Sequence, residues 1–175
     1  LFYIMIAFSQ IYAKSTPTVS EAGYAMGLGF SPQIFTALLL CSAISLAITI
    51  AISGKYIDIV GRRIWLIWTT FGVAIFGLAL PYFLDNGTTT SLFWFLMIGM
   101  GLIGMGYGPL ASLLPELFPT HARYSGASLT YNISGLFGAS VAAIITLPLN
   151  ANYGLKGVGI YLTLNAIVSL IGLWF

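Results

Sequence analysis

The chain has 175 residues, of which 59% are hydrophobic and 6% are charged, against about 25% charged residues in an ordinary soluble domain. A soluble fold of this length cannot hide so much apolar surface, so most of these side chains must meet lipid. The formal net charge of +2 comes from few residues and offers no basic surface for a polyanion, which excludes nucleic-acid partners.

Charge-free intervals predict six membrane-spanning helices. A charged residue at the bilayer centre costs about 2.5–3.5 kcal/mol, and a span needs about 20 apolar residues, so long uncharged runs mark the spans. The runs are continuous rather than alternating, which excludes the strands of a membrane barrel. The expected spans are residues 1–14, 33–53, 64–84, 91–114, 124–148 and 157–175, within a single all-α membrane domain of residues 1–175.

Both ends of the chain lie in apolar runs. Leu1 opens the sequence without an initiator methionine or the basic segment of a signal peptide, and Phe175 ends it inside the sixth expected span. We therefore expect the chain to be part of a longer protein.

Loop charges predict the orientation of the bundle, because Lys and Arg are enriched on the cytoplasmic side of membrane proteins. The connections after the second and fourth spans carry four such residues and the opposite side carries two; they are Lys55, Arg62, Arg63 and Arg123, against Lys14 and Lys156. We expect the loops around Asp58 and Arg123 to be cytoplasmic.

The first motif is the basic stretch between the second and third expected spans. It contains Gly54, Asp58, Gly61, Arg62 and Arg63, and its two glycines predict a tight turn. Asp58 can accept hydrogen bonds from either arginine or from the N-terminal amides of a neighbouring helix. The stretch either sets topology alone or acts as a conformational latch whose ion pairs form in one state and break in another.

The second motif connects the fourth and fifth expected spans. Glu116 and Arg123 flank a turn stiffened by Pro115 and Pro119, where the carboxylate and the guanidinium can face each other or their loop neighbours. An exposed pair contributes only about 0–1 kcal/mol, so its use would lie in switching, together with Asp58 and Arg62. The histidine in this loop, at position 121, is either a solvated residue or a pH sensor.

Small residues repeat at four-residue spacing in the fourth and fifth expected spans. Such strips let a neighbouring helix approach closely, and Pro109 predicts a kink beside the first strip. The strips are Gly104, Gly108 and Ser112, and Ser134, Gly138 and Ala142.

Polar residues inside spans are candidates for a substrate cavity. For each, hydrogen bonding between helices is an equally good explanation. Ser128 and Asn132 are four residues apart and share one helix face. The candidates are Gln10, Tyr12, Ser128, Tyr131 and Asn132.

Both motifs resemble loops of the major facilitator superfamily. The first resembles the loop between helices eight and nine, although Ile59 stands where that family usually has a basic residue. Residues 115–133 resemble the junction of helices ten and eleven in the metabolite:proton symporter family, which includes proline/betaine, shikimate, citrate and α-ketoglutarate permeases. The resemblance implies the C-terminal repeat, helices seven to twelve, of a twelve-helix transporter.

The resemblance also implies a function. We expect proton-coupled symport of a small organic metabolite by alternating access in the plasma (inner) membrane. The implied partners are the substrate, protons, the lipid bilayer and the missing N-terminal six-helix half, and no cofactor is needed beyond the proton gradient. A sugar-type facilitator or uniporter and a non-transporting structural membrane subunit are the alternatives.

Enzymatic chemistry and metal binding are not expected. The chain has four acidic residues and one histidine, which are scattered rather than clustered. Its one cysteine, Cys41, lies in an apolar run and is expected to be a small buried hydrophobe. No Asp or Glu falls well inside a span, so a proton-carrying carboxylate should lie in the missing half.

Overall fold

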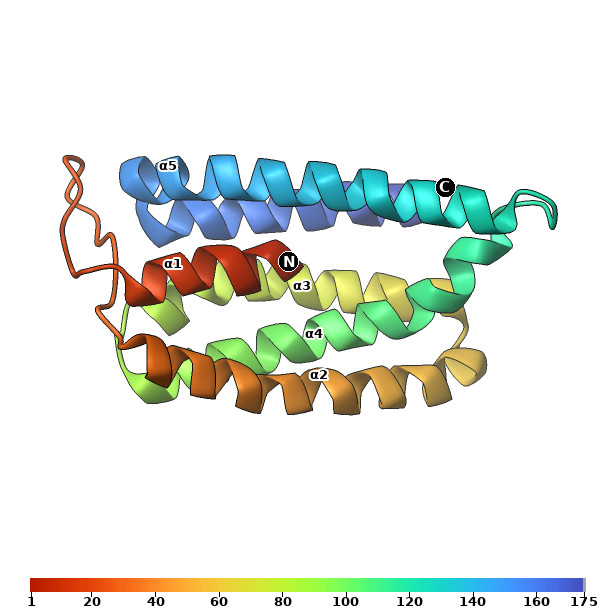
Figure 1. The fold of residues 1–175 in the computed structure, drawn as a ribbon, viewed down its shortest axis with the longest axis horizontal. Helices are drawn as coiled ribbons and strands as arrows, with labels where there is room; N and C mark the ends of the chain where they lie inside the picture. Colours follow the sequence, from red (N-terminus) through yellow and green to blue (C-terminus); the bar gives the residue numbers. More distant parts are fainter. Residues whose placement is uncertain (175) are drawn as a thin grey trace.

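The computed structural model describes residues 1–174, apart from the side chains of residues 137, 139 and 143, and its regular elements are all helices. Figure 1 shows them running along one long axis as a bundle. Among the described residues, four helices (α2 to α5) are long and apolar enough to cross a membrane, which confirms the predicted all-α membrane fold. In chain order the elements are η1 (Ile4–Phe8), α1 (Ser9–Lys14), α2 (Pro32–Val60), α3 (Arg62–Leu84), α4 (Thr89–Glu116) and α5 (Arg123–Trp174).

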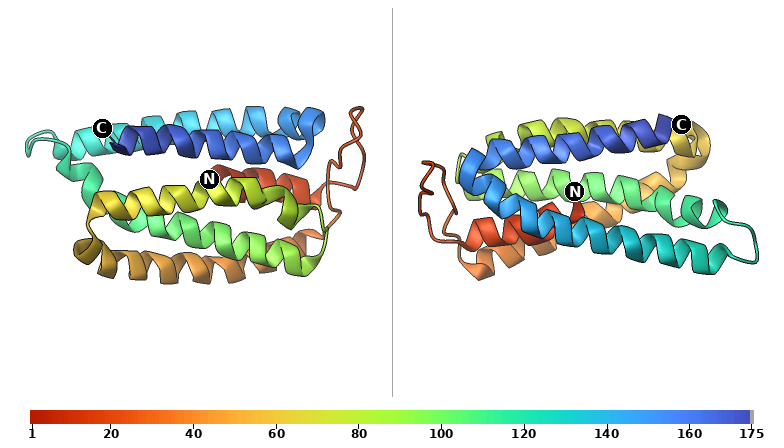
Figure 2. Two further views of the ribbon diagram at one scale, coloured as in Figure 1. Left: turned by 180° about the vertical axis from the view of Figure 1, so that it is seen from behind. Right: turned by 90° about the horizontal axis from the view of Figure 1, so that it is seen from above.

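The long element α5 consists of two helices that meet at Gly154. This residue has φ 66° and ψ −170°, a conformation that glycine adopts without the steric cost of a Cβ atom. Figures 1 and 2 show the chain reversing there, so that residues 155–174 run back opposite to residues 123–153. The fifth span therefore continues past its expected end at residue 148.

The number of spans stays a prediction. The described part of the first helix, η1 with α1, is shorter than a bilayer crossing, and the last residue of the sixth expected span lies outside the described residues. The division of the chain into one domain is likewise untested.

The predicted turn between the second and third spans is wrong in extent. α2 continues through Gly54 to Val60, and Gly61 alone, with φ 94° and ψ 133°, joins it to α3. A glycine inside a helix costs only about 0.5–1 kcal/mol relative to alanine, and nothing in residues 55–60 stops the helix. Asp58 therefore projects from the last turns of a helix rather than from a loop.

The first small-residue strip forms the interface between α2 and α4, as predicted. A methyl group at Gly104 would overlap Thr49, and one at Gly108 would overlap Ser53. The Ser45 hydroxyl donates a hydrogen bond of 3.0 Å to the Met97 carbonyl across the same interface. Close packing between small residues, which drives helix association in membranes, thus joins these two helices.

The second strip is packed only in part. Ser134 and Gly138 are exposed, and the ring of Tyr3 lies 3.5 Å from where a Cβ atom of Gly138 would be, an ordinary contact, whereas Ala142 is buried. The close approach that sequence reasoning missed joins α3 to the second helix of α5, where Gly77 and Gly159 face each other and neither could carry a Cβ atom without overlap.

The end of α4 turns away from the line of the helix. Figure 1 shows its last part leading over toward α5, in the region that contains Pro109 and Pro115. Proline lacks an amide hydrogen and bends a helix at the preceding turn, so this agrees with the expected kink.

The core lies between the first helix, α3, α4 and the second helix of α5. α2 packs on one side only, and Cys41, expected to be buried, is exposed on its outward face near Leu40 and Ile44. The largest buried side chains of the core include Phe8, Tyr12, Phe76, Leu80, Phe95, Leu96, Val158 and Leu162.

The segment 15–31 covers one end of the bundle. It folds back on itself through a single antiparallel bridge between Val19 and Ala25, and Figure 1 shows it extending beyond the helix ends. Its amides at Leu28 and Phe30 donate to the carbonyls of Tyr12 and Ala13, which ties it to the end of α1.

Candidate functional site

An ion pair joins α3 to α4 at the end of the bundle opposite segment 15–31. Arg62, the first residue of α3, donates through Nη1 to the carboxylate of Glu116, the last residue of α4. A positive charge at a helix N-terminus and a negative charge at a helix C-terminus each oppose the helix macrodipole. Because each charge is unfavourable alone, pairing them removes two local penalties at once.

Arg63 makes a different contact. Its Nε donates to the Leu173 carbonyl at 2.7 Å and its Nη2 donates to the Trp174 carbonyl, so it connects the start of α3 to the end of α5. Two adjacent arginines therefore hold three helices together at this end.

The predicted partners of Asp58 and Arg123 are not the ones observed. Both guanidinium groups that could have faced Asp58 are directed elsewhere. Of the two arrangements expected for Glu116, facing Arg123 or acting in company with Arg62, the structure shows the contact with Arg62. Asp58 and Arg123 are exposed and have no ion pair among the described residues. The cause is the longer α2, which carries Asp58 up to the end of the helix rather than into a shared loop.

Trp65, near the connection between α2 and α3, supplies a hydrogen bond that a proline in α4 removes. The carbonyl of Met105 would normally accept from the amide four residues later, but that residue is Pro109, which has no amide hydrogen. The indole Nε1 of Trp65 donates to this carbonyl at 3.0 Å. Sequence reasoning missed Trp65, although an in-helix proline always signals a carbonyl in need of a donor.

The turn of the second motif is closed by an aromatic ring. The ring of Phe118 lies where a Cβ atom of Gly126 would be, so any larger residue at that position would displace the ring. The motif thus couples the turn after α4 to the first turns of α5 by packing.

Ser128 and Asn132 lie on one exposed face of α5, as the spacing predicts. The Asn132 Nδ2 donates to the Ser128 carbonyl at 2.8 Å and to its hydroxyl at 3.4 Å. No hydrogen bond among the described residues links either side chain to another helix, so interhelical bonding does not explain them in this structure.

Gln10 and Tyr12 are placed differently. Tyr12 is 2% exposed and stacks on Phe8 with ring centroids 5.6 Å apart, so it is a core residue rather than part of an open cavity surface. Gln10 is half-buried on the same helix.

Tyr131 lines a cavity of about 270 Å³ between α4 and α5, whose other walls include Tyr107 and Pro115. Tyr107 also packs against Phe2 of the first helix at 6.1 Å between ring centroids. Sequence reasoning included Tyr131 but missed Tyr107, a polar-tipped aromatic in a glycine-rich helix. The first helix, α4 and α5 thus meet around this cavity.

Comparison with known proteins identifies the family. Residues 24–175 match the family described as "Sugar (and other) transporter". No solved structure matches the chain at a significant level.

Curated relatives agree with that match. A Haemophilus influenzae protein named "Putative metabolite transport protein" is 89% identical over 175 residues, all of this chain and 39% of its own length. "Inner membrane metabolite transport protein YhjE" of Escherichia coli is 38% identical over 174 residues, 99% of this chain and 38% of its own length. "Proline/betaine transporter" of Salmonella typhimurium is 30% identical over 122 residues, 69% of this chain and 24% of its own length.

These relatives and the matching family are transporters, not enzymes, in agreement with the sequence. The chain spans less than half the length of each of them. With its apolar helix bundle and its two family-like motifs, the chain belongs to the sugar (and other) transporter family of the major facilitator superfamily.

Proposed function

We propose that this chain is the C-terminal half of a secondary transporter that carries a small organic metabolite together with protons across the inner membrane. The observation that carries the proposal is the match of residues 24–175 to a transporter family. In this proposal the two halves of the full-length protein rock around a central site, and the end of the bundle with Arg62 and Glu116 faces the cytoplasm.

The ion pair at the joint supports a gating role. Arg62 and Glu116 link two helix ends through side chains that are 34% and 55% exposed, and one glycine connects α2 to α3 there. A pair this exposed stabilises the fold by only about 0–1 kcal/mol, so a few new contacts in another state suffice to replace it. Such a pair is suited to a switch between two arrangements.

Asp58 extends the gate to the missing half. It is exposed at the end of α2 and has no ion-pair partner among the described residues. We place its partner, either a basic side chain or a helix N-terminus, in the N-terminal half when the cytoplasmic side is closed. Replacing Asp58 by Asn should slow uptake by the full-length protein, and uptake at the wild-type rate contradicts this role.

The substrate site lies, in this proposal, where the first helix, α4 and α5 meet. Tyr107 and Tyr131 offer aromatic faces with hydroxyl tips, and Ser128 and Asn132 offer polar groups on the neighbouring exposed face of α5. Such a mixture of aromatic and neutral polar groups suits a zwitterionic or weakly acidic metabolite. The proline/betaine transporter relative is consistent with that class.

The coupling proton requires a titratable group outside this chain's spans. All four acidic residues lie at helix ends or in loops: Glu21, Asp58, Asp85 and Glu116. We therefore place the proton-carrying carboxylate in the N-terminal half.

Uptake into vesicles bearing the full-length protein tests the proposal. Competition among betaine, proline, shikimate and dicarboxylates should identify the substrate, and a protonophore should abolish accumulation. Accumulation that persists after the proton gradient collapses contradicts symport. Equilibration without accumulation favours the sugar-type facilitator, which the family description also includes. No transport of any solute favours a structural subunit.

A further inference from the structure

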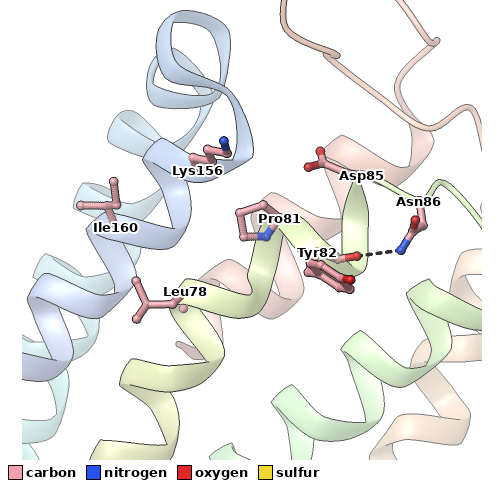
Figure 3. Close-up of a pocket in the computed structure, with 8 residues that line it drawn as sticks. Leu78, Pro81, Tyr82, Asp85, Asn86, Lys156 and Ile160 are labelled. Atoms are coloured by element: carbon pink, nitrogen blue, oxygen red, sulfur yellow. Dashed lines mark hydrogen bonds between the residues drawn. The ribbon is translucent and has the colours of Figure 1, made fainter.

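An open groove lies apart from the proposed substrate site. It has a volume of about 670 Å³ and runs between α3 and the second helix of α5, at the end of the bundle that carries segment 15–31. Figure 3 shows Asp85 and Lys156 at its outer end, with Leu78 and Ile160 deeper along the two helices. Pro81 and Tyr82 form the wall between them.

The face that holds this groove is built to meet lipid. On α3 the exposed large side chains recur every three or four residues and are apolar or aromatic. Tyr82 ends this stripe close to the C-terminus of α3, and aromatic residues are common at the ends of membrane spans. The exposed polar side chains Ser128 and Asn132 lie elsewhere, on the first helix of α5. The stripe consists of Trp68, Phe71, Ile75, Leu78 and Tyr82.

The two charges at the groove are not explained by the helices that carry them. Asp85 caps the C-terminus of α3, where the macrodipole disfavours a carboxylate. Lys156 lies in the first turn after the reversal at Gly154, where the macrodipole disfavours an ammonium group. Among the described residues neither forms an ion pair. A cation and an anion thus stand exposed at the mouth of an apolar groove, each without a structural partner.

A second groove adjoins the first. It has a volume of about 440 Å³, is lined by Tyr153 and Leu164 among others, and shares Lys156 and Ile160 with the larger groove. Two apolar grooves therefore run from one cationic side chain, one on each side of Ile160. Leu78 lies seven residues from Asp85, about 10 Å along the helix at 1.5 Å per residue. The apolar wall of the groove therefore lies within about 10 Å of the charges at its mouth.

We propose that these grooves bind a phospholipid whose headgroup carries a primary amine, such as phosphatidylethanolamine. Lys156 binds the phosphate and Asp85 accepts hydrogen bonds from the headgroup ammonium. The two acyl chains lie in the two grooves, against Leu78 on one side and Leu164 on the other. The charge pattern selects this headgroup, because a phosphatidylglycerol headgroup has no cation for Asp85 and a phosphatidylcholine headgroup has no N–H to donate. This site is independent of the proposed transport function and of the orientation of the bundle.

Native mass spectrometry of the full-length protein in detergent tests the site with three lipids of identical chains: phosphatidylethanolamine, phosphatidylglycerol and phosphatidylcholine. The wild type should retain phosphatidylethanolamine best. Lys156→Gln should lower its retention about fivefold, the equivalent of ~1 kcal/mol for one basic residue at the membrane surface when 1.4 kcal/mol is tenfold. Asp85→Asn should lower phosphatidylethanolamine to the level of phosphatidylglycerol, whose own retention should not fall, because Asp85 offers that anionic headgroup no attraction.

Two substitutions at the same end of the bundle provide controls. Lys14, whose ammonium lies 5.5 Å from the centre of the Phe35 ring, and Glu21 in segment 15–31 both lie outside the groove. Lys14→Gln and Glu21→Gln should leave retention of all three lipids unchanged. Equal loss in Lys156→Gln and Lys14→Gln, or unchanged retention in Lys156→Gln, overturns the site.

A groove-filling variant covers the case in which Lys156→Gln does not fold. Ile160 lines both grooves, so Ile160→Trp should place a larger side chain in them while keeping both charges. It should lower phosphatidylethanolamine retention by displacing the chains, and unchanged retention overturns the proposal. Weaker binding of phosphatidylethanolamine than of both other lipids contradicts the headgroup assignment.

Discussion

The two ends of the bundle are held together by different kinds of contact. At one end, Arg62 contacts Glu116 through exposed charged groups beside a one-residue joint. At the other, segment 15–31 docks on the reversal of α5 through neutral groups: Ser20 donates to the Ala151 carbonyl at 2.7 Å and Asn150 donates to the Ala25 carbonyl at 3.1 Å. Charged contacts at a surface are weak and exchangeable, whereas buried neutral contacts hold one geometry.

This difference separates a switching end from a fixed end within this half. We call the end with segment 15–31 the neutral end and the end with Arg62 and Glu116 the charged end. Disruption of the neutral end should lower stability with little dependence on salt. Disruption of the charged end should change the balance between conformations more than it changes stability.

The largest loss is expected at Gly154. Gly154→Val places a branched side chain at φ 66° and pushes it into the ring of Tyr24. Strain of about 1–3 kcal/mol plus displacement of the ring should lower stability by roughly 2–4 kcal/mol, seen as a lower Tm in detergent. Gly172→Ala, at a helical glycine with open space around it, is the control and should not lower the Tm. An equal fall in Tm for both variants would show that the backbone reversal at Gly154 has no special need for glycine.

Ser20 should come next. Its hydroxyl donates to the Ala151 carbonyl and accepts from the Tyr24 amide at 3.2 Å, so Ser20→Ala removes two hydrogen bonds from the docked segment. The expected loss is about 1–2 kcal/mol, independent of salt. Thr90→Ala at the same end serves as the control, because Thr90 is exposed and makes no side-chain hydrogen bond among the described residues. A salt-dependent loss at Ser20 would show that this end is not held by neutral contacts.

Trp65→Phe tests whether the indole N–H replaces the hydrogen bond that Pro109 cannot donate. Loss of the indole N–H should destabilise the protein by about 1 kcal/mol, because the Met105 carbonyl loses its donor. In a Pro109→Ala background the amide of residue 109 can donate to that carbonyl, so the same substitution should cost less. The double-mutant cycle measured by thermal unfolding gives the coupling directly. Strict additivity would mean that Trp65 acts only by packing.

The smallest effect on stability is expected for the ion pair. Arg62→Gln and Glu116→Gln should each change stability by only about 0–1 kcal/mol, and less at high salt. Uptake rates should change more than the Tm, and the charge-reversed pair Arg62→Glu with Glu116→Arg should recover part of the rate. Lys55→Gln, at an exposed residue nearby, is the control for net charge. A full loss of stability in Arg62→Gln would mean that the charged end is structural rather than a switch.

Sequence reasoning found the all-α membrane fold and some of the contacts between its helices. The α2–α4 glycine strip was predictable because residues four apart on a helix always share a face, whatever they face. The pairing of Ser128 with Asn132 followed from the same rule. Arg62, Arg63 and Glu116 were recognised as gating candidates from their positions in the two motifs, and their role stays a prediction.

What failed depended on geometry between helices. The extent of α2 decided that Asp58 stands away from both arginines, and no local pattern reveals how far a helix runs past a glycine. The exposure of Cys41 and the burial of Tyr12 depend on which helix covers which, because in a membrane the apolar pattern is nearly the same on lipid-facing and buried sides.

The sequence by itself determined that this chain is a helical membrane bundle, because the exclusion of charge from lipid acts locally along the chain. Only the tertiary structure decided that Glu116 pairs with Arg62, that Trp65 serves the Met105 carbonyl, and that Asp85 and Lys156 share one groove. Each of those contacts joins residues far apart in sequence, and their approach is set by how small residues let helices pack.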